Sequence, residues 1–124
     1  MKLVKCDSCG KMALIVKDSA CPTKCCGQDM TEQVPNTVDA AREKHLPVVK
    51  AEGSAVTVEI GSVAHPMLEQ HYIEFIILET SEGIQKKDLK PGDAPKAVFA
   101  LAPGEKAVAA YAYCNLHGFW KTEL

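Results

Sequence analysis

The sequence lacks three features that would assign it quickly to a functional class. None of its apolar runs approaches the ~18 residues that a membrane-spanning helix needs, and the chain reaches Cys6 before any apolar signal segment could form. No basic block stands out among 14 basic and 16 acidic residues, so nucleic-acid binding has no electrostatic support. We therefore expect a cytoplasmic protein with no membrane or nucleic-acid partner.

Long hydrophobic patterns are also missing from residues 1–36, although five of the six cysteines lie there. A segment this short cannot bury much of itself and needs another source of stability. In a reducing compartment, clustered thiols are more often metal ligands than disulfides. We therefore expect this segment to fold around a metal ion.

The cysteine spacing suggests one tetrahedral site. Cys6 and Cys9 form a Cys-x-x-Cys pair followed by Gly10, and the adjacent Cys25 and Cys26 supply a second pair of sulfurs. Five cysteines compete for four positions, and Cys21 is the expected spare. Four thiolates suit either zinc or a rubredoxin-like iron centre, and the spacing alone leaves both open.

After residue 47 the chain has the pattern of an all-β domain. Residues 56–60 alternate apolar and polar side chains, as a half-buried strand does. Further strands are expected at 72–79, 84–89, 96–101, 107–114 and 119–120, separated by Gly- and Pro-rich turns. With an extended segment near 48–49, these make about seven strands, as an immunoglobulin-like antiparallel sandwich requires. The predicted domains are residues 1–36 and 37–124.

One helical stretch is expected between the two domains. Residues 36–44 could form one or two turns, with Asn36 or Thr37 as the N-cap and Pro47 ending the helical conformation. This places His45 where a helical turn or loop gives way to an extended segment. Loops held by rigid neighbours are common positions for ligands.

Histidine is scarce, and all four copies lie at predicted loops or strand ends. His65 and His71 flank a Pro-Met turn, His45 precedes a proline, and His117 follows Cys114 by three residues. One thiolate with imidazoles and no carboxylate cluster disfavours Mg²⁺ and Ca²⁺. Zinc would be saturated by four ligands, whereas five donors fit a square-pyramidal iron with one position open for a small ligand.

Three other interpretations remain open at this point. A blue-copper electron carrier would also place Cys and His close together near the end of a sandwich, but no methionine follows His117 to act as the axial ligand. A non-catalytic electron-transfer or iron-sensing module and a zinc-ribbon-plus-sandwich binding protein are the other two. Metal content and a visible spectrum would separate these classes.

Six segments, in order, resemble the desulfoferrodoxin family, the two-iron form of superoxide reductase, over essentially the whole length. They are Cys6-x-x-Cys9-Gly10, Cys25-Cys26, Asn36-Thr37-Val38-Asp39, Glu43-Lys44-His45-x-Pro47-Val48, Ala64-His65-Pro66-Met67 with His71-Tyr72, and Tyr113-Cys114-Asn115-x-His117-Gly118.

The resemblance implies two irons per chain. A desulforedoxin-like knob would hold a tetrahedral iron through Cys6, Cys9, Cys25 and Cys26. The catalytic iron would take four equatorial nitrogens and one axial thiolate, from His45, His65, His71, His117 and Cys114. The implied reaction is one-electron reduction of superoxide to hydrogen peroxide, with electrons from a rubredoxin-like donor.

The resemblance also gives roles to two residues that are not expected to be permanent ligands. It implies that Lys44 attracts the superoxide anion, and that the Glu43 carboxylate can occupy the sixth position of the ferric resting state. It further implies a homodimer, and backbone amides near residues 115–117 that donate to the Cys114 sulfur. The remaining conspicuous side chains are expected to serve packing: Met67, Tyr72, Tyr113 and Trp120.

Overall fold

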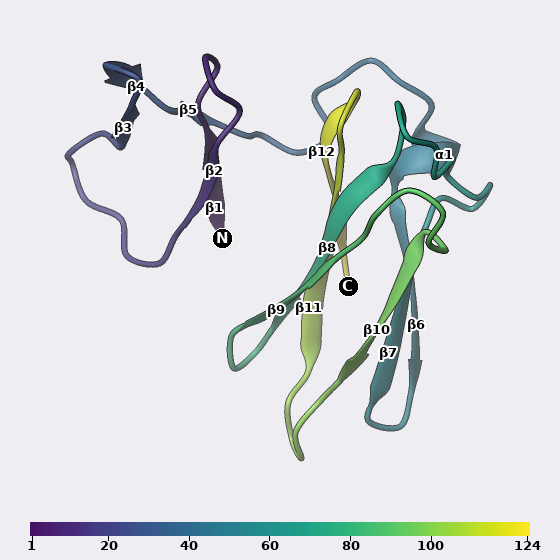
Figure 1. Ribbon diagram of the computed structural model, residues 1–124. Coiled ribbons are helices and arrows are strands. Elements are labelled where there is room, and N and C mark those ends of the chain that lie inside the picture. Colours follow the sequence, from purple (N-terminus) through teal and green to yellow (C-terminus); the bar gives the residue numbers. More distant parts are fainter. The chain divides into compact units, whose positions relative to one another are not determined.

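The computed structural model describes residues 1–124 and separates into two compact units, Met1–Val34 and Pro35–Leu124 (Figure 1). Strands dominate both units, and the only helix is α1 (Arg42–His45). This helix is far too short to cross a bilayer, and no other helix exists that could. The all-β fold class predicted from the sequence is confirmed.

The N-terminal unit is built from five short strands in two small sheets. Strands β1 (Lys2–Lys5), β2 (Met12–Ile15) and β5 (Thr31–Glu32) form an antiparallel sheet in the order β2-β1-β5. Strands β3 (Lys24–Cys25) and β4 (Gln28–Asp29) form a hairpin. Strands β1 and β5 give no clear sequence signal because they are short and rich in charge.

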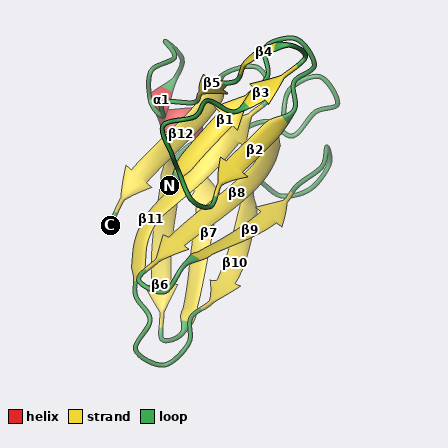
Figure 2. Ribbon diagram, turned by 90° about the vertical axis from the view of Figure 1, so that its left-hand side faces the viewer, coloured by secondary structure: helices red, strands yellow, loops and turns green.

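The C-terminal unit has the seven strands of the predicted sandwich, in a three-stranded and a four-stranded antiparallel sheet (Figure 2). The first sheet has the order β10-β7-β6 and the second β12-β11-β8-β9. The strands are β6 (Pro47–Glu52), β7 (Ala55–Ile60), β8 (Ile73–Thr80), β9 (Ile84–Asp88), β10 (Lys96–Ala100), β11 (Ala107–Cys114) and β12 (Gly118–Glu123).

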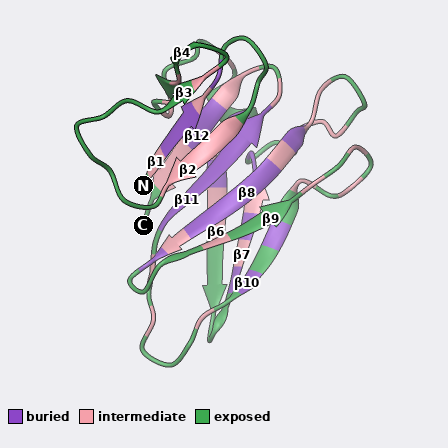
Figure 3. Cartoon of the chain, turned by 60° about the vertical axis from the view of Figure 1, so that its left-hand side comes forward, coloured by how far each residue is buried: buried purple, intermediate pink, exposed green.

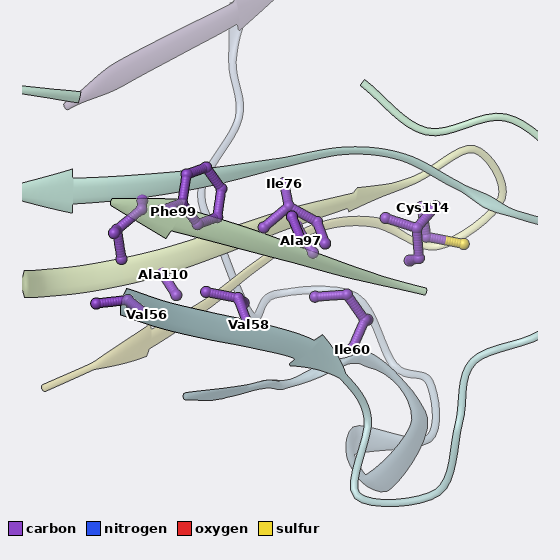
Figure 4. Close-up of a cluster of buried hydrophobic side chains, with 11 residues drawn as sticks. Val56, Val58, Ile60, Ile76, Ala97, Phe99, Ala110 and Cys114 are labelled. Carbon is purple, nitrogen blue, oxygen red and sulfur yellow. The ribbon is translucent and has the colours of Figure 1, made fainter. Parts of the chain in front are cut away.

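The core lies between these two sheets, and strands β8 and β11 are buried along most of their length (Figure 3). Inward-facing side chains of four strands form one cluster: Val56, Val58, Ile60, Ile73, Ile76, Leu78, Ala97, Phe99, Ala110, Ala112 and Cys114. Cys114 lies at one end of this cluster, with its sulfur directed away from the other core side chains (Figure 4). The apolar core therefore fixes the position of a thiol at one end of the sandwich.

Side chains connect the two sheets at both lateral edges of the sandwich. On one side, Gln85 and Lys87 of edge strand β9 donate hydrogen bonds to the carbonyls of Ala100 and Val98 on edge strand β10. On the other side, the Thr122 hydroxyl of β12 donates to the Pro47 carbonyl of β6 over 2.8 Å. Three backbone carbonyls of the edge strands β10 and β6 are thus satisfied by side chains of the facing sheet.

The helix differs from the sequence prediction. It begins at Arg42, after Ala41 as an N-cap without a side-chain hydrogen bond, and so Asn36 and Thr37 do not cap it. Asn36 instead adopts a left-handed conformation with φ 63°. Its side chain exchanges two hydrogen bonds with the backbone of Lys121. This tertiary anchor on β12 outweighs the local tendency to start a helix at residue 36.

Candidate metal centres

The first candidate centre lies wholly in the N-terminal unit and contains four sulfurs within 4.8 Å of one another: Cys6, Cys9, Cys25 and Cys26. The backbone amide of Gly10 donates to the Cys6 carbonyl over 2.9 Å and closes the first turn. Cys9 Sγ lies 3.7 Å from Cys25 Sγ. Four convergent thiols at such separations fit a tetrahedral ion.

The hairpin turn explains how two adjacent cysteines serve one site. Residues 26 and 27 connect β3 to β4, and both have positive φ, at 52° for Cys26 and 74° for Gly27. Two consecutive positive φ angles are the mark of a type I′ turn, whose twist matches that of the hairpin. The turn brings the Cys25 and Cys26 sulfurs to 3.9 Å from each other.

The pKa values of these thiols are shifted in a way that favours binding of a cation between them. The Cys9 backbone amide donates to the Cys6 sulfur and lowers the pKa of Cys6 to about 7. Hydrogen bonds with Cys9, Cys6 and Cys25 raise the pKa of Cys26 to about 12. Without metal the sulfurs share protons, because four thiolates at this distance repel one another. A bound cation removes this penalty.

Cys21 stands apart from this group. It is exposed and belongs to neither cluster of potential metal ligands. Its backbone amide donates to the Ser19 hydroxyl in the loop between β2 and β3. The structure thus leaves outside the group the cysteine that the sequence nominated as the spare.

The second candidate centre lies at the end of the sandwich where α1, the start of β8 and the β11–β12 turn are found (Figure 1). His45 is the last residue of α1, and Cys114 is the last of β11. His65 and His71 come from the crossover between β7 and β8. The donor atoms of these four residues lie within 4.8 Å of one another.

His117 joins the same cluster from the β11–β12 turn. Its Nδ1 lies 3.1 Å from His45 Nε2 and 3.8 Å from Cys114 Sγ. Its ring centroid is 5.0 Å from that of His71. All five residues nominated for this site from the sequence are therefore brought together.

Hydrogen bonds to backbone carbonyls define the tautomers of two histidines in the cluster. His45 Nδ1 lies 2.7 Å from the Ala41 carbonyl, and His65 Nδ1 lies 2.6 Å from the Pro66 carbonyl. A carbonyl only accepts, so both Nδ1 atoms carry the proton and both Nε2 atoms present lone pairs. These two lone pairs face each other across 3.2 Å. Two lone pairs so close repel each other unless a shared proton or a metal ion relieves the repulsion, and the nearby His117 and Cys114 donors favour a metal ion.

His71 gives a second sign of the same kind. Its Nε2 atom is buried and has no hydrogen-bond partner. A buried polar nitrogen without a partner carries a desolvation penalty of about 1–3 kcal/mol, which coordination of a metal ion removes. The donor set of four imidazoles and one sulfur therefore fits a transition metal such as iron.

Trp120 holds two of the ligands, a role that the sequence did not reveal. Its ring is fully buried and stacks on His45 at a centroid distance of 4.8 Å and an interplanar angle of 24°. Its indole Nε1 donates to the His117 carbonyl over 3.1 Å. Trp120 does pack in the core as expected, but it also orients two ligand-bearing residues.

Burial and backbone amides shift the pKa of the Cys114 thiol in opposite directions. The residue is fully buried, and burial raises the pKa of its thiol. Hydrogen bonds from the backbone amides of His117 and Leu116 lower it in part. These amides lie on the tight turn after β11, where they stabilise a thiolate and moderate its donation to a metal.

Glu43 and Lys44 are exposed on α1, directly before His45. The pKa of His71 is lowered mainly by burial, then by His117 and by the charge of Lys44. The pKa of His45 is also lowered mainly by burial, and the Glu43 carboxylate opposes that shift weakly. Both exposed side chains therefore lie within electrostatic reach of the cluster.

Gly61 shapes the support under α1. It has φ +87°, and its amide donates to the Leu46 carbonyl over 3.1 Å. A Cβ atom there would lie 2.8 Å from the Lys44 carbonyl oxygen and 2.9 Å from that of Glu43. The turn that carries the ligand His45 thus rests directly on a glycine backbone.

We predict that the metal-free chain loses stability in mild acid because His65 must remain neutral. Burial lowers the pKa of His65 from 6.5 to about 4. A depressed folded pKa means that the stabilisation is complete above pH 6.5 and is lost as the pH falls towards 4. Urea unfolding at pH 7 and pH 5 measures this, and His65→Gln should show a smaller difference. Equal pH dependence in both proteins would contradict it.

Comparisons with known proteins find relatives over nearly the whole chain. The family model "Desulfoferrodoxin" matches residues 37–123. The desulfoferrodoxin homolog of Archaeoglobus fulgidus is 45% identical over 122 residues, which cover 98% of this chain and 96% of the relative. The crystal structure of the superoxide reductase from Treponema pallidum is similar with a TM-score of 0.81 and 39% identity, over 92% of this chain and 93% of that one.

A third relative resembles a smaller part of the chain. The superoxide reductase (1Fe-SOR) from Giardia intestinalis is similar with a TM-score of 0.56 and 38% identity, over 66% of this chain and 99% of that one. The family model covers well over half of this chain, and the A. fulgidus relative aligns with nearly all of it. The chain belongs to the desulfoferrodoxin family.

Proposed function

We propose that this protein is a superoxide reductase that converts superoxide to hydrogen peroxide at the His45–His65–His71–His117–Cys114 site. The observation that carries the proposal is the pair of facing Nε2 lone pairs of His45 and His65 beside a buried thiol. Iron held there would supply one electron to superoxide, and two protons would complete hydrogen peroxide. The chain's own residues hold the ion, attract the anion and shield the sulfur from water.

We propose that the two domains, residues 1–36 and 37–124, each carry one iron. The thiol group of the N-terminal unit suits a tetrahedral iron, and the sandwich suits the catalytic ion. The Giardia relative, a one-iron superoxide reductase, spans about two thirds of this chain. This supports a sandwich that can act with its own metal alone, and an N-terminal centre that relays electrons or stabilises the chain.

The test is a pulse of superoxide on the pre-reduced, iron-loaded chain. A reductase yields one hydrogen peroxide per superoxide and no oxygen, whereas a dismutase yields half as much peroxide together with oxygen. The visible band of the thiolate-bound iron should appear as the superoxide is consumed. Two zinc ions and no colour after expression with iron would overturn the proposal.

We predict that Lys44→Ala slows the reaction with superoxide by about 3- to 10-fold at low ionic strength, because a local positive charge steers the anion. Steering matters here since the formal net charge is -2. The second-order rate should also lose most of its salt dependence. Lys50→Ala is the matched control, because it makes the same change in net charge on β6, where Lys50 pairs with Glu59. Equal rates and salt slopes in both variants would remove the steering role.

We predict that Glu43→Ala changes the absorption spectrum of the oxidised protein while the reaction of the reduced protein with superoxide stays within about 3-fold. The Glu43 carboxylate, next to His45, would be available as a further ligand to a ferric ion held by the cluster. Glu52→Ala, an exposed carboxylate at the end of β6, is the control. An oxidised spectrum identical to that of the parent would count against coordination by Glu43.

Three further assignments complete the proposal. The electron donor is a small rubredoxin-like protein, since the catalytic ion must be reduced again after each turnover. The chain works in the cytoplasm, where reduced thiols are maintained. It acts as a homodimer, which offers a short N-terminal unit a larger surface to bury. Sedimentation of the iron-loaded chain tests the last point.

A further inference from the structure

Asn115 is not a metal ligand, yet three hydrogen bonds connect it to the segment that carries His71. Its Nδ2 donates to the Gln70 carbonyl over 3.1 Å, and its Oδ1 accepts from the Tyr72 amide over 2.9 Å. Its own amide donates to the Tyr72 carbonyl over 3.2 Å. One residue thus holds the backbone on both sides of His71.

His71 depends on its backbone more than two of the other histidines do. The rings of His45 and His65 are each fixed by a hydrogen bond from Nδ1 to a backbone carbonyl. The Nε2 of His71 is buried without a partner, and no hydrogen bond of its ring orients it. The orientation of this ring therefore follows from the position of the chain at residues 70–72.

That segment is a tight turn that cannot position itself. Leu68 and His71 exchange backbone hydrogen bonds of 2.9 and 3.1 Å, which close the turn internally. These two bonds preserve the shape of the turn, and its position depends on bonds to other elements. Met67 accepts a hydrogen bond from the Gly92 amide before the turn, and Ile73 pairs with Cys114 after it. Asn115 adds the side-chain attachment closest to His71, from the residue directly after Cys114.

We propose that Asn115 is a positioning residue that fixes His71 relative to the Cys114 sulfur. Because one side chain holds the His71 segment and its backbone continues from the thiolate, the two ligands move together. Without the amide group, the turn can shift away from the end of β11 while the other three histidines stay in place. This inference rests on the proposed function only in treating the cluster as an iron site.

The experiment compares Asn115→Ala with Asn36→Ala in the full chain reconstituted with iron. Asn36 makes the same type of clamp, with two side-chain hydrogen bonds of 3.0 and 2.9 Å to the backbone of Lys121. Asn36→Ala therefore removes the same chemistry without touching a ligand segment. The spectrum of the four-cysteine iron in the same sample is an internal reference.

In Asn115→Ala we expect a shifted thiolate-to-iron band and release of the catalytic iron to a chelator that is about 10- to 100-fold faster. Asn36→Ala should lower stability but leave this band in place, and the four-cysteine spectrum should be unchanged in both. A parent-like band and release rate in Asn115→Ala, or the same shift in both variants, would overturn the proposal.

A readout without metal separates this inference from the proposed function. In the metal-free protein, the Tyr72 amide should exchange with solvent faster in Asn115→Ala than in the parent, because its acceptor is gone. The His71 ring signals should shift in the same variant. If the parent binds no iron at the cluster, the proposed function fails, and unchanged Tyr72 exchange and His71 signals would then still overturn the role of Asn115.

Discussion

Cys114→Ser is expected to reduce the rate of superoxide reduction by at least about 100-fold, the largest effect that we predict for a single ligand. A serine hydroxyl does not ionise in this buried position and cannot push electron density towards iron as a thiolate does. The thiolate-to-iron band should vanish. Stopped-flow measurements of superoxide decay and the visible spectrum test both expectations.

Cys9→Ser is the complementary variant, because it should disrupt the four-cysteine site and leave the histidine site intact. Cys9 is exposed and belongs to the four-cysteine group. Its loss should remove the first iron spectrum and leave the thiolate band of the second site intact. Slower reduction of the catalytic iron in this variant would indicate an electron relay, and lower stability alone would indicate a structural role.

If Cys114→Ser kept the rate of the parent protein, the assignment of Cys114 as a ligand would be wrong.

Gly61→Ala is expected to lower the free energy of unfolding by about 2–4 kcal/mol and to weaken metal binding at the histidine cluster. The added Cβ would lie 2.2 Å from the Val63 carbonyl oxygen, closer than atoms can approach. Relief of this clash requires α1 or the 61–63 loop to move, and α1 carries His45. Urea unfolding and iron retention measure the two effects.

Gly104→Ala is the matched control for this substitution. Gly104 has φ +83°, close to the +87° of Gly61, but an added Cβ there would meet nothing within 4 Å. It should cost only the left-handed strain of about 1–2 kcal/mol and leave iron retention unchanged. Similar iron loss in both variants would show that backbone strain, and not displacement of α1, explains the effect.

Much of the fold was predictable because the strands signal themselves locally. Alternation in β7, continuous apolar character in β8 and Gly- or Pro-rich turns indicated seven strands in the sandwich, which the structure confirms. The helix was misplaced because the conformation of Asn36 is set by Lys121, which lies 85 residues away in the sequence. No local pattern reports such a contact.

In the candidate site, the metal ligands were predictable from the sequence and the residues that support them were not. The cysteines are clustered and the chain has only four histidines, so their spacing together with the resemblance to the family nominated the residues that the structure brings together. The supporting residues were not nominated, because Trp120, Asn115 and Gly61 act through stacking, backbone hydrogen bonds and close approach. A Trp or Asn in a strand or turn has many ordinary uses, and only the folded chain distinguishes these.

The side chains that join the sheets at their margins also bear on the behaviour of the protein at high concentration. An open sheet edge presents a row of unpaired backbone groups on which a strand of another molecule can add. Gln85, Lys87 and Thr122 occupy acceptors on such edges from within the same molecule. An intruding strand would first have to displace them. These contacts therefore hinder strand addition along β10 and at the start of β6, and they do not depend on a bound metal ion.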